Sequence, residues 1–446
     1  MNTTYQVPAV LPTGRLEEKI GEFKPSFNPA GAVAEANRCL YCHDAPCSKA
    51  CPTTIDIPEF IRKIATGNLR GAARTILSSN ILGHSCARVC PVDVLCQGSC
   101  VYHNFQQPPI QIGRLQRYAT DHALFYGMKF FQKGHSTGKQ VAIVGAGPAG
   151  LACAHQLTLL GHEAVVFDAS PYPGGLNVAG IAAYKMKSQA VLDEVHQIME
   201  IGFTVRCNTM IGRDISVEEL DKNFDAILFA TGLGADSIPE LEGVNLDGVT
   251  GAVALINRIK LDPNFTLDEV KNAIIIGGGN TAIDAVRELL QIGVHQVTML
   301  YRRSIEEMSG YTHEWKAARE EGANVHWQTI PTAIHGIDNR VKQLHCIRVQ
   351  GGSSPHVPDV VADSEFSLPA DLVVFAVGQQ RFRAFFTTLG IDFKAGKVQV
   401  NPNSGQTSNP RYFAAGDCVN GAKEVVNAVA EGRQAAFGID QLLRTN

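Results

Sequence analysis

The chain beyond residue 139 repeats one arrangement of apolar and polar positions. QVAIVGAGPAGLACAHQLTLLG, followed by EAVVFDA, consists of an apolar run, a glycine-rich turn, an amphipathic segment and a second apolar run. The same order returns in NAIIIGGGNTAIDAVRELLQIG, followed by QVTMLYRR. Short apolar runs that alternate with amphipathic segments predict βαβ units. Two such units, about 130 residues apart, predict an α/β protein with two Rossmann-like nucleotide-binding domains.

The first 135 residues have helical signals in place of this alternation. Asn28 before Pro29 is typical of an N-cap followed by proline at the first helical position. Asp56 before Ile57-Pro58 predicts a second helix start. One face of that helix would carry Ile57, Phe60, Ile61 and Ile64. The pattern therefore predicts an N-terminal helical domain, separated from the nucleotide-binding units by a polar linker over 132–140.

Composition narrows the class of protein. A chain of 446 residues that is 45% hydrophobic and 18% charged can form two or three folded domains. The net charge of -4 does not suggest a nucleic-acid-binding protein. We find neither an apolar run of about 20 residues nor a signal peptide, so we expect a cytoplasmic protein without a membrane span.

Cysteine is concentrated near the N-terminus: eight of the 12 cysteines lie between Cys39 and Cys100. They form one group with Cys39, Cys42, Cys47 and Cys51, and a second with Cys86, Cys90, Cys96 and Cys100. In a cytosolic protein such a cluster indicates metal binding or redox chemistry rather than structural disulfides. The Cys-Pro pairs favour [4Fe–4S] ligation, but neither group has ferredoxin spacing. Zinc and buried free thiols therefore remain open at this point.

The first glycine-rich turn meets the structural context of a dinucleotide fingerprint, because it follows a predicted strand and opens a predicted helix. Its residues are Gly145, Ala146, Gly147, Pro148, Ala149 and Gly150. Pyrophosphate would lie at the helix N-terminus. Asp168, which follows the next strand, is the acid expected to bind ribose hydroxyls.

The second turn, with Gly278, Gly279, Asn280 and Thr281, is followed by a strand that ends in Arg302 and Arg303 rather than in an acid. Two arginines would bind a 2′-phosphate, which favours NADP over NAD. The alternative is a solvated strand end. Two dinucleotide folds in one chain indicate a flavin that exchanges electrons with a nicotinamide.

Three further strand ends are candidate cofactor-binding positions. They carry Thr231 and Gly232, then Ala376, Val377 and Gly378, and finally Gly416 and Asp417. Each is a weak signal alone, and the order of the three along the chain gives them weight.

That order resembles the flavoprotein family that contains the small subunit of glutamate synthase and the N-terminal half of dihydropyrimidine dehydrogenase. The resemblance covers Pro25 to Arg444 and rests on the cysteine cluster, GAGPAG, PGGL, ATG, GGGNTA, YRR and AAGD. The segments RCLYCHDAPCSKACP and PIQIGRLQRYATD resemble the dihydropyrimidine dehydrogenase branch in particular. The resemblance implies FAD, two [4Fe–4S] clusters and NADPH or NADH, with the nicotinamide domain inserted into the FAD domain.

The resemblance also implies ligands and binding residues. One cluster would be held by Cys39, Cys42, Cys47 and Cys100, and the other by Cys51, Cys90, Cys96 and Gln116, which leaves Cys86 without a role. The flavin would contact Gly175, Leu176, Lys185 and Val425, with Lys185 able to stabilise the reduced flavin. Ser309 stands where the animal enzymes have a further arginine, which weakens the NADP prediction.

The implied domains are a helical iron–sulfur domain over 1–135, an FAD domain over 136–237 and 377–446, and an NAD(P) domain over 238–376. The animal enzymes continue into an FMN barrel and a ferredoxin domain, whereas this sequence stops at Asn446. We therefore expect an electron-input subunit of a dihydropyrimidine dehydrogenase, in a hetero-oligomer with a catalytic subunit that carries FMN and iron–sulfur clusters. The alternatives are the NADPH-oxidising subunit of glutamate synthase, a related electron-bifurcating or sulfide-linked reductase, and a non-catalytic scaffold that binds nucleotide and zinc.

Overall fold

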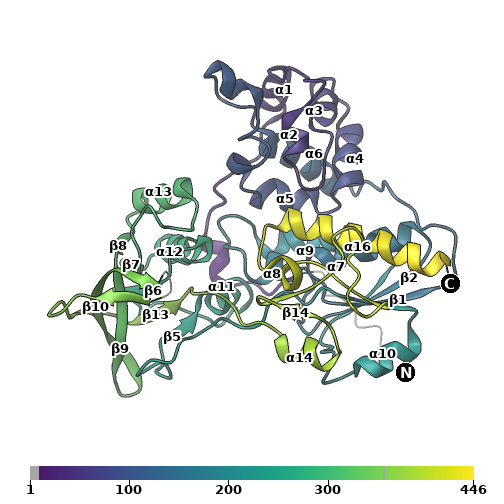
Figure 1. Cartoon of the computed structure of the whole chain (residues 1–446). Helices are drawn as coiled ribbons and strands as arrows, with labels where there is room; N and C mark the ends of the chain where they lie inside the picture. Colours follow the sequence, from purple (N-terminus) through teal and green to yellow (C-terminus); the bar gives the residue numbers. More distant parts are fainter. Residues whose placement is uncertain (1–9, 355–356, 446) are drawn as a thin grey trace.

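The computed structural model describes residues 10–354 and 357–445. Its N-terminal part is a cluster of helices on top of the nucleotide-binding part of the chain (Figure 1). The elements of this cluster are α1 (Pro29–Asn37), α2 (Pro46–Lys49), α3 (Ile57–Ala65), α4 (Leu69–Ser79), α5 (Gly83–Val89), η2 (Val92–Val94), η3 (Val101–Phe105) and α6 (Ile112–Phe125). The preceding η1 (Leu16–Lys19) packs instead against α11 (Ala252–Leu261) and α12 (Asn280–Ile292).

The two predicted helix starts in this domain are confirmed. The Oδ1 of Asn28 accepts a hydrogen bond from the backbone N–H of Gly31 at 2.7 Å. Asp56 caps α3 in the same way through Glu59. The predicted apolar face of α3 is buried against α1, α4 and α6, so local capping and hydrophobic burial act together here.

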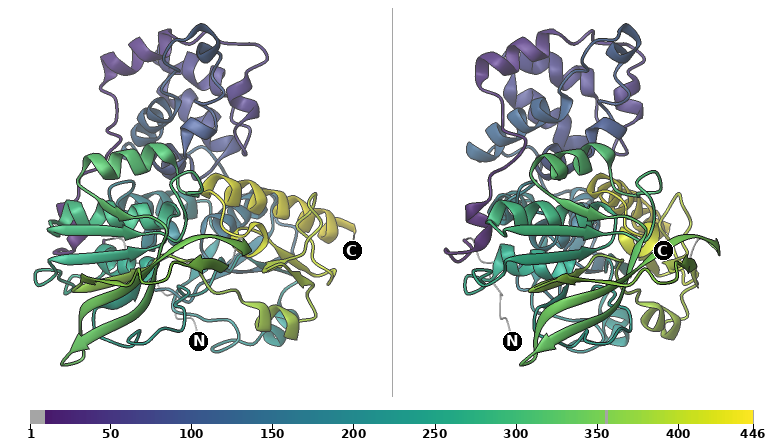
Figure 2. Two further views of the ribbon diagram at one scale, coloured as in Figure 1. Left: turned by 60° about the vertical axis from the view of Figure 1, so that its left-hand side comes forward. Right: turned by 90° about the vertical axis from the view of Figure 1, so that its left-hand side faces the viewer.

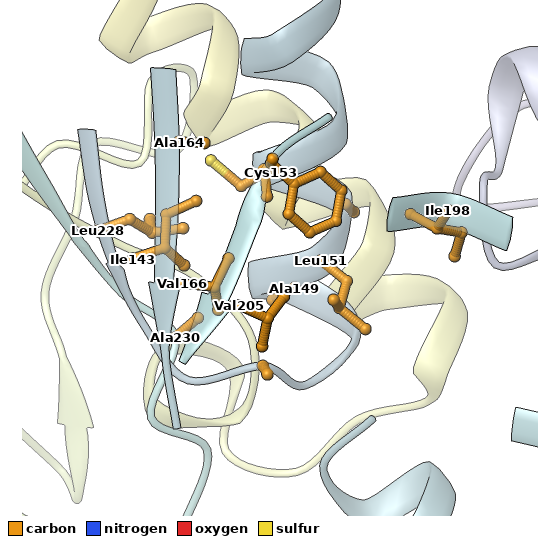
Figure 3. Packing of buried hydrophobic residues seen from close by; sticks show 14 of the residues in the cluster. Ile143, Ala149, Leu151, Cys153, Ala164, Val166, Ile198, Val205, Leu228 and Ala230 are labelled. Carbon is orange, nitrogen blue, oxygen red and sulfur yellow. The ribbon is translucent and has the colours of Figure 1, made fainter. Parts of the chain in front are cut away.

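The first nucleotide-binding unit is built on a five-stranded parallel sheet in the order β16-β4-β1-β2-β3. Its strands are β1 (Gln140–Val144), β2 (Glu163–Phe167), β3 (Thr204–Arg206), β4 (Ala226–Phe229) and β16 (Tyr412–Ala414). The helices α7 (Pro148–Leu159), α8 (Leu176–Ala179), α9 (Ser188–Met199), α10 (Val217–Asn223), α15 (Asp417–Asn420) and α16 (Val425–Thr445) belong to this unit. Figure 3 shows Ile143, Val166 and Leu228 of the sheet packed toward Leu151 and Cys153 of α7.

The second unit lies in the chain between β4 and β16, which confirms the predicted insertion. Its parallel sheet has the order β5-β13-β6-β7-β8. The strands are β5 (Val249–Gly251), β6 (Asn272–Ile276), β7 (Gln296–Leu300), β8 (Asn324–His326) and β13 (Leu372–Phe375). Its helices are α11 (Ala252–Leu261), α12 (Asn280–Ile292) and α13 (Thr312–Glu320). The α/β fold class with two Rossmann-like units is therefore confirmed.

An antiparallel sheet extends from the second unit, and its two longest strands form a long curved hairpin (Figure 2). It consists of β9 (Thr329–Ile337), β10 (Arg340–Ser354), β11 (Val357–Val360) and β12 (Phe366–Pro369). The remaining elements, α14 (Arg383–Thr388), β14 (Phe393–Lys394) and β15 (Lys397–Val398), lead back to β16. Within 10–354 and 357–445, the helices are too short or too polar to cross a membrane.

Candidate flavin, nicotinamide and iron–sulfur sites

The turn between β1 and α7 is shaped by two close backbone approaches. Gly145 has φ of +112°, and a Cβ there would lie 2.2 Å from the carbonyl oxygen of Ala230. A Cβ on Gly150 would lie 1.9 Å from the carbonyl oxygen of Gly145. Only glycine fits at both positions, which is the physical reason for the fingerprint. Gly147, by contrast, lines the cavity, and a Cβ there would meet only the Cα of Gly175 at 3.9 Å, so the backbone is accessible where pyrophosphate would approach.

Asp168 lies at the end of β2, as predicted, and borders the same cavity. Its Oδ2 accepts a hydrogen bond from the N–H of Ala146 at 2.6 Å, and its Oδ1 accepts one from Ser170 at 2.7 Å. The carboxylate is thus held in a fixed orientation beside the glycine-rich turn, with oxygen lone pairs left to accept from hydroxyl groups.

One large cavity, with a volume of about 720 Å³, joins the two nucleotide-binding units. Its wall contains predicted residues of the first unit: Gly145, Gly147, Pro148, Ala149, Asp168, Gly175, Leu176, Lys185, Thr231, Gly232, Gly416, Asp417 and Val425. From the second unit it contains Asn280 and Thr281. The dimensions and the mixed polar and apolar wall fit a dinucleotide, so the residues present fit FAD.

The other residues predicted for the nicotinamide lie outside that wall. Gly278, Gly279, Arg302, Arg303, Ala376, Val377 and Gly378 gather at the carboxyl ends of β6, β7 and β13. A Cβ on Gly277 would lie 2.4 Å from the carbonyl oxygen of Ala376, so β6 and β13 end side by side. This edge of a parallel sheet is where a nucleotide binds in such folds. Arg302 is exposed there, and Ser309 is exposed too.

Lys185 is surrounded by groups that the sequence did not indicate. Its Nζ lies 2.8 Å from Oδ1 of Asp284 on α12 and 2.9 Å from Oε1 of Glu314 on α13. Burial alone would lower the pKa of Lys185, but these two carboxylates outweigh burial and leave the pKa raised. The flavin-side cation is therefore protonated and paired with the nicotinamide unit.

Asp284 had no predicted role, yet it lines the cavity and also accepts a 2.6 Å hydrogen bond from the hydroxyl of Tyr184. It stands four residues after Asn280 in α12, so helical periodicity would have placed both on one face. A second contact joins the units, because the hydroxyl of Tyr311 donates to Oε1 of Glu424 at 2.8 Å. Burial raises the pKa of Glu424 in spite of that hydrogen bond.

The eight clustered cysteines divide between two small cavities in the helical domain. The first cavity is bordered by Cys39, Cys42, Cys47 and Cys100. The second is bordered by Cys51, Cys86, Cys90, Cys96 and Gln116. Four thiols come together in the first cavity although Cys100 is distant in sequence, as the resemblance implied. This donor set of soft thiolates fits a [4Fe–4S] cluster.

Burial changes the pKa of at least one thiol in each cavity. It raises the pKa of Cys47 to about 11 and that of Cys96 to about 12. A metal cluster would offset this cost, since it binds the thiolate directly. Across the described part of the chain, no three His, Cys, Asp or Glu side chains are close enough to hold a single metal ion.

Two candidates compete for the fourth position in the second cavity. Gln116 is buried in α6, and its Nε2 donates to the carbonyl oxygen of Gly83 at 2.7 Å, which leaves Oε1 as the atom able to bind a metal. Cys86, predicted to have no role, borders the same cavity and hydrogen bonds to Cys90.

The second cavity is adjacent to the flavin cavity. Val89 and Pro91, on either side of Cys90, belong to the wall of the flavin cavity. At the start of α16, Val425 lines the flavin cavity while Val426 lines the second cysteine cavity. Of the two cysteine cavities, the second is therefore the one next to the flavin cavity.

Comparison with known proteins places this arrangement in a class. Residues 16–128 match the domain family described as dihydropyrimidine dehydrogenase domain II, 4Fe-4S cluster. Residues 139–432 match the pyridine nucleotide-disulphide oxidoreductase family. Among solved structures, FprA from Mycobacterium tuberculosis in complex with NADPH covers 69% of this chain and 85% of its own, with a TM-score of 0.58 and 18% identity. Thioredoxin reductase of Lactococcus lactis has a TM-score of 0.53 at 20% identity over 69% of this chain and all of its own. These structures share the fold.

The fold and the site define an NAD(P)H-dependent FAD and iron–sulfur oxidoreductase. Subunit PreT of NAD-dependent dihydropyrimidine dehydrogenase from Escherichia coli K12 is 36% identical over 95% of this chain and 97% of its own. The glutamate synthase [NADPH] small chain of the same organism is 36% identical over 94% and 93%. This chain belongs to the flavoprotein family that contains these two proteins.

Proposed function

We propose that this chain is the electron-input subunit of a dihydropyrimidine dehydrogenase. The observation that carries the proposal is the position of the flavin cavity, which has Asn280 and Thr281 of the nicotinamide unit in its wall and the second cysteine cavity beside it. FAD held in this cavity would supply the link between two-electron hydride transfer from NADPH or NADH and one-electron transfer to iron–sulfur clusters. The electrons would pass to a partner subunit that carries FMN and interconverts uracil or thymine with the 5,6-dihydropyrimidines.

In this proposal the residues of the chain bind and orient the cofactors. The β1–α7 turn and Asp168 would bind the pyrophosphate and ribose of FAD, and the edge with Arg302 and Arg303 would bind the nicotinamide nucleotide. Lys185 would hold its ammonium at the flavin cavity, paired with the carboxylates of Asp284 and Glu314. One [4Fe–4S] cluster would be held by Cys39, Cys42, Cys47 and Cys100, and the other by Cys51, Cys90, Cys96 and Gln116. The domain boundaries at 135, 237 and 376 belong to the proposal as well.

The pyrimidine branch is supported by two features: the match of 16–128 to a dihydropyrimidine dehydrogenase domain, and Gln116 in the wall of the second cavity. The glutamate synthase small chain is the second candidate, because its identity and coverage are nearly the same. The match to a 4Fe-4S domain family speaks against the zinc-binding scaffold.

Co-purification from the native host distinguishes the two branches. We expect a partner with FMN, and uracil reduction with NADH or NADPH when both subunits are present. A partner with glutamine amidotransferase activity would overturn the pyrimidine assignment in favour of glutamate synthase. Anaerobic titration of this chain alone with each nucleotide, followed at the flavin absorbance, determines which one it uses.

The fourth ligand of the second cluster is tested by a pair of variants. If Gln116 is the ligand, Gln116→Ala changes the electron paramagnetic resonance (EPR) signal of one cluster, whereas Cys86→Ser leaves both signals unchanged. The reverse result would assign the position to Cys86.

A further inference from the structure

Asn80, the residue that follows α4, lies in the wall of the second cysteine cavity. Its side chain is buried, at 0% exposure. Oδ1 accepts a hydrogen bond from the backbone N–H of Leu82 at 3.1 Å, which fixes the plane of the amide. Nδ2 is buried too, and in the described part of the chain no protein atom accepts a hydrogen bond from it.

A buried amide N–H without an acceptor is costly, at about 1–3 kcal/mol. Such a group in a folded protein requires an explanation, and an absent ligand at that position is one. The other side chains around this cavity are the proposed ligands, the thiol of Cys86 and apolar groups, among them Ile55, Ile57, Val92, Leu95 and Val426. The acceptor that Asn80 lacks is thus expected inside the cavity.

We propose that the Nδ2–H group of Asn80 donates a hydrogen bond to a sulfur atom of the iron–sulfur cluster held in this cavity. The inference rests on the proposed second cluster. An N–H donor at a cluster sulfur offsets the extra negative charge of the reduced state, and it therefore raises the reduction potential. Asn80 is accordingly a positioning residue that tunes the cluster next to the flavin and is not itself a ligand.

The geometry supplies a matched pair of variants. Asn80→Asp keeps an oxygen that accepts from Leu82 and replaces the donor with a second oxygen, whereas Asn80→Leu removes both functions and keeps the branched shape of the side chain. Asn68→Asp is the control, because Asn68 caps the opposite end of α4 through Gly71 at 2.8 Å and is exposed. The holoprotein is titrated under anaerobic conditions, with each cluster followed by EPR and with iron and flavin content measured.

We expect both clusters to assemble in all three variants. The potential of one cluster should fall in Asn80→Asp and Asn80→Leu, while the other cluster and the flavin keep their potentials and Asn68→Asp matches the parent protein. Two assembled clusters with unchanged potentials in both Asn80 variants would overturn the inference. A parent protein that holds fewer than two clusters would instead overturn the proposed function.

A measurement on the parent protein covers the case in which the Asn80 variants lose the cluster. With ¹⁵N introduced at asparagine side chains, pulsed EPR of the reduced protein should detect a weak ¹⁵N coupling to one cluster. Absence of any asparagine coupling, with both clusters present and reduced, would show that the amide donates elsewhere, for example to a water molecule.

Discussion

At the scale of single residues, the ammonium of Lys185 is paired with two buried carboxylates. Asp284 and Glu314 lie within 3 Å of its ammonium, and all three side chains are at most 12% exposed. These three side chains therefore place one positive and two negative charges at the flavin cavity. Removing a partner from a buried ion pair leaves an uncompensated charge, which costs far more than the loss of an exposed pair.

Lys185→Met tests this difference. We expect a loss of about 3 kcal/mol in the free energy of unfolding, because two carboxylates remain buried without a cation. The matched control is Lys133→Met, which removes an ion pair with Glu163 whose side chains are 35% and 47% exposed. That change should cost less than about 1 kcal/mol. Equal losses in urea denaturation of the two variants would contradict this reading of Lys185.

Asp417 makes stability depend on pH. Burial, and then the nearby Glu431 carboxylate, raise the pKa of Asp417 to about 6 from its ordinary 3.8. Protonation of Asp417 is thus more favourable in the folded state, so its contribution to stability is complete below pH 3.8 and is lost as the pH rises through about 6. The shift corresponds to about 3 kcal/mol.

We expect Asp417→Asn to flatten the decline in stability between about pH 4 and pH 7, since asparagine does not titrate. Thermal unfolding of flavin-free protein at several pH values measures this. An unchanged slope would show that Asp417 titrates normally in the folded protein.

At the scale of elements, helix α5 depends on a residue of another domain. It carries Cys86 and leads directly to Cys90, and its N-terminus has no cap from its own sequence. Instead Glu194 of α9 accepts hydrogen bonds from the N–H groups of His84 at 2.8 Å and Ser85 at 3.1 Å. A carboxylate at a helix N-terminus satisfies free donors and interacts favourably with the helix dipole. The flavin domain thereby holds the helix that borders the second cluster site.

Glu194→Ala should lower the free energy of unfolding by about 2–4 kcal/mol, because it leaves two buried N–H groups without acceptors. Glu194→Gln keeps one acceptor oxygen and should retain part of that stability. Hydrogen–deuterium exchange should show faster exchange in α5 for the alanine variant. If exchange in α5 were no faster in either variant than in the parent protein, α5 would be held by its packing alone.

The sequence predicted those parts of the molecule whose physical requirement is local. Gly145 and Gly150 are needed by a turn of six residues, and Asn28 caps a helix that begins at the next residue. The division of eight cysteines into two sets is not local, because Cys100 joins Cys39 only through the packing of helices. The resemblance supplied that division. Glu314 escaped prediction for the same reason, since its partner Lys185 is over 100 residues away.

At the scale of the whole molecule, three sites follow one another. The flavin cavity lies between the nucleotide units, and the second cysteine cavity adjoins it near Val89 and Pro91. The first cysteine cavity lies among α2, α3 and η3. Ile57 borders both cysteine cavities, so the two are neighbours. From this arrangement we expect an order in which the proposed second cluster would exchange electrons with the flavin, and the proposed first cluster would exchange electrons with the second.

The order predicts an asymmetry between two cysteine variants. Cys42→Ala removes a proposed ligand of the first site, and NADH or NADPH should still reduce both the flavin and the second cluster at the parental rate. Cys96→Ala removes a proposed ligand of the second site, and the nucleotide should then reduce the flavin but leave the first cluster oxidised. Rapid freezing followed by EPR measures each step, and dithionite serves as the control that the first cluster has assembled in Cys96→Ala. If the nucleotide reduced the first cluster at the parental rate in that variant, electrons would reach it without the second site, and the series inferred from the cavities would be wrong.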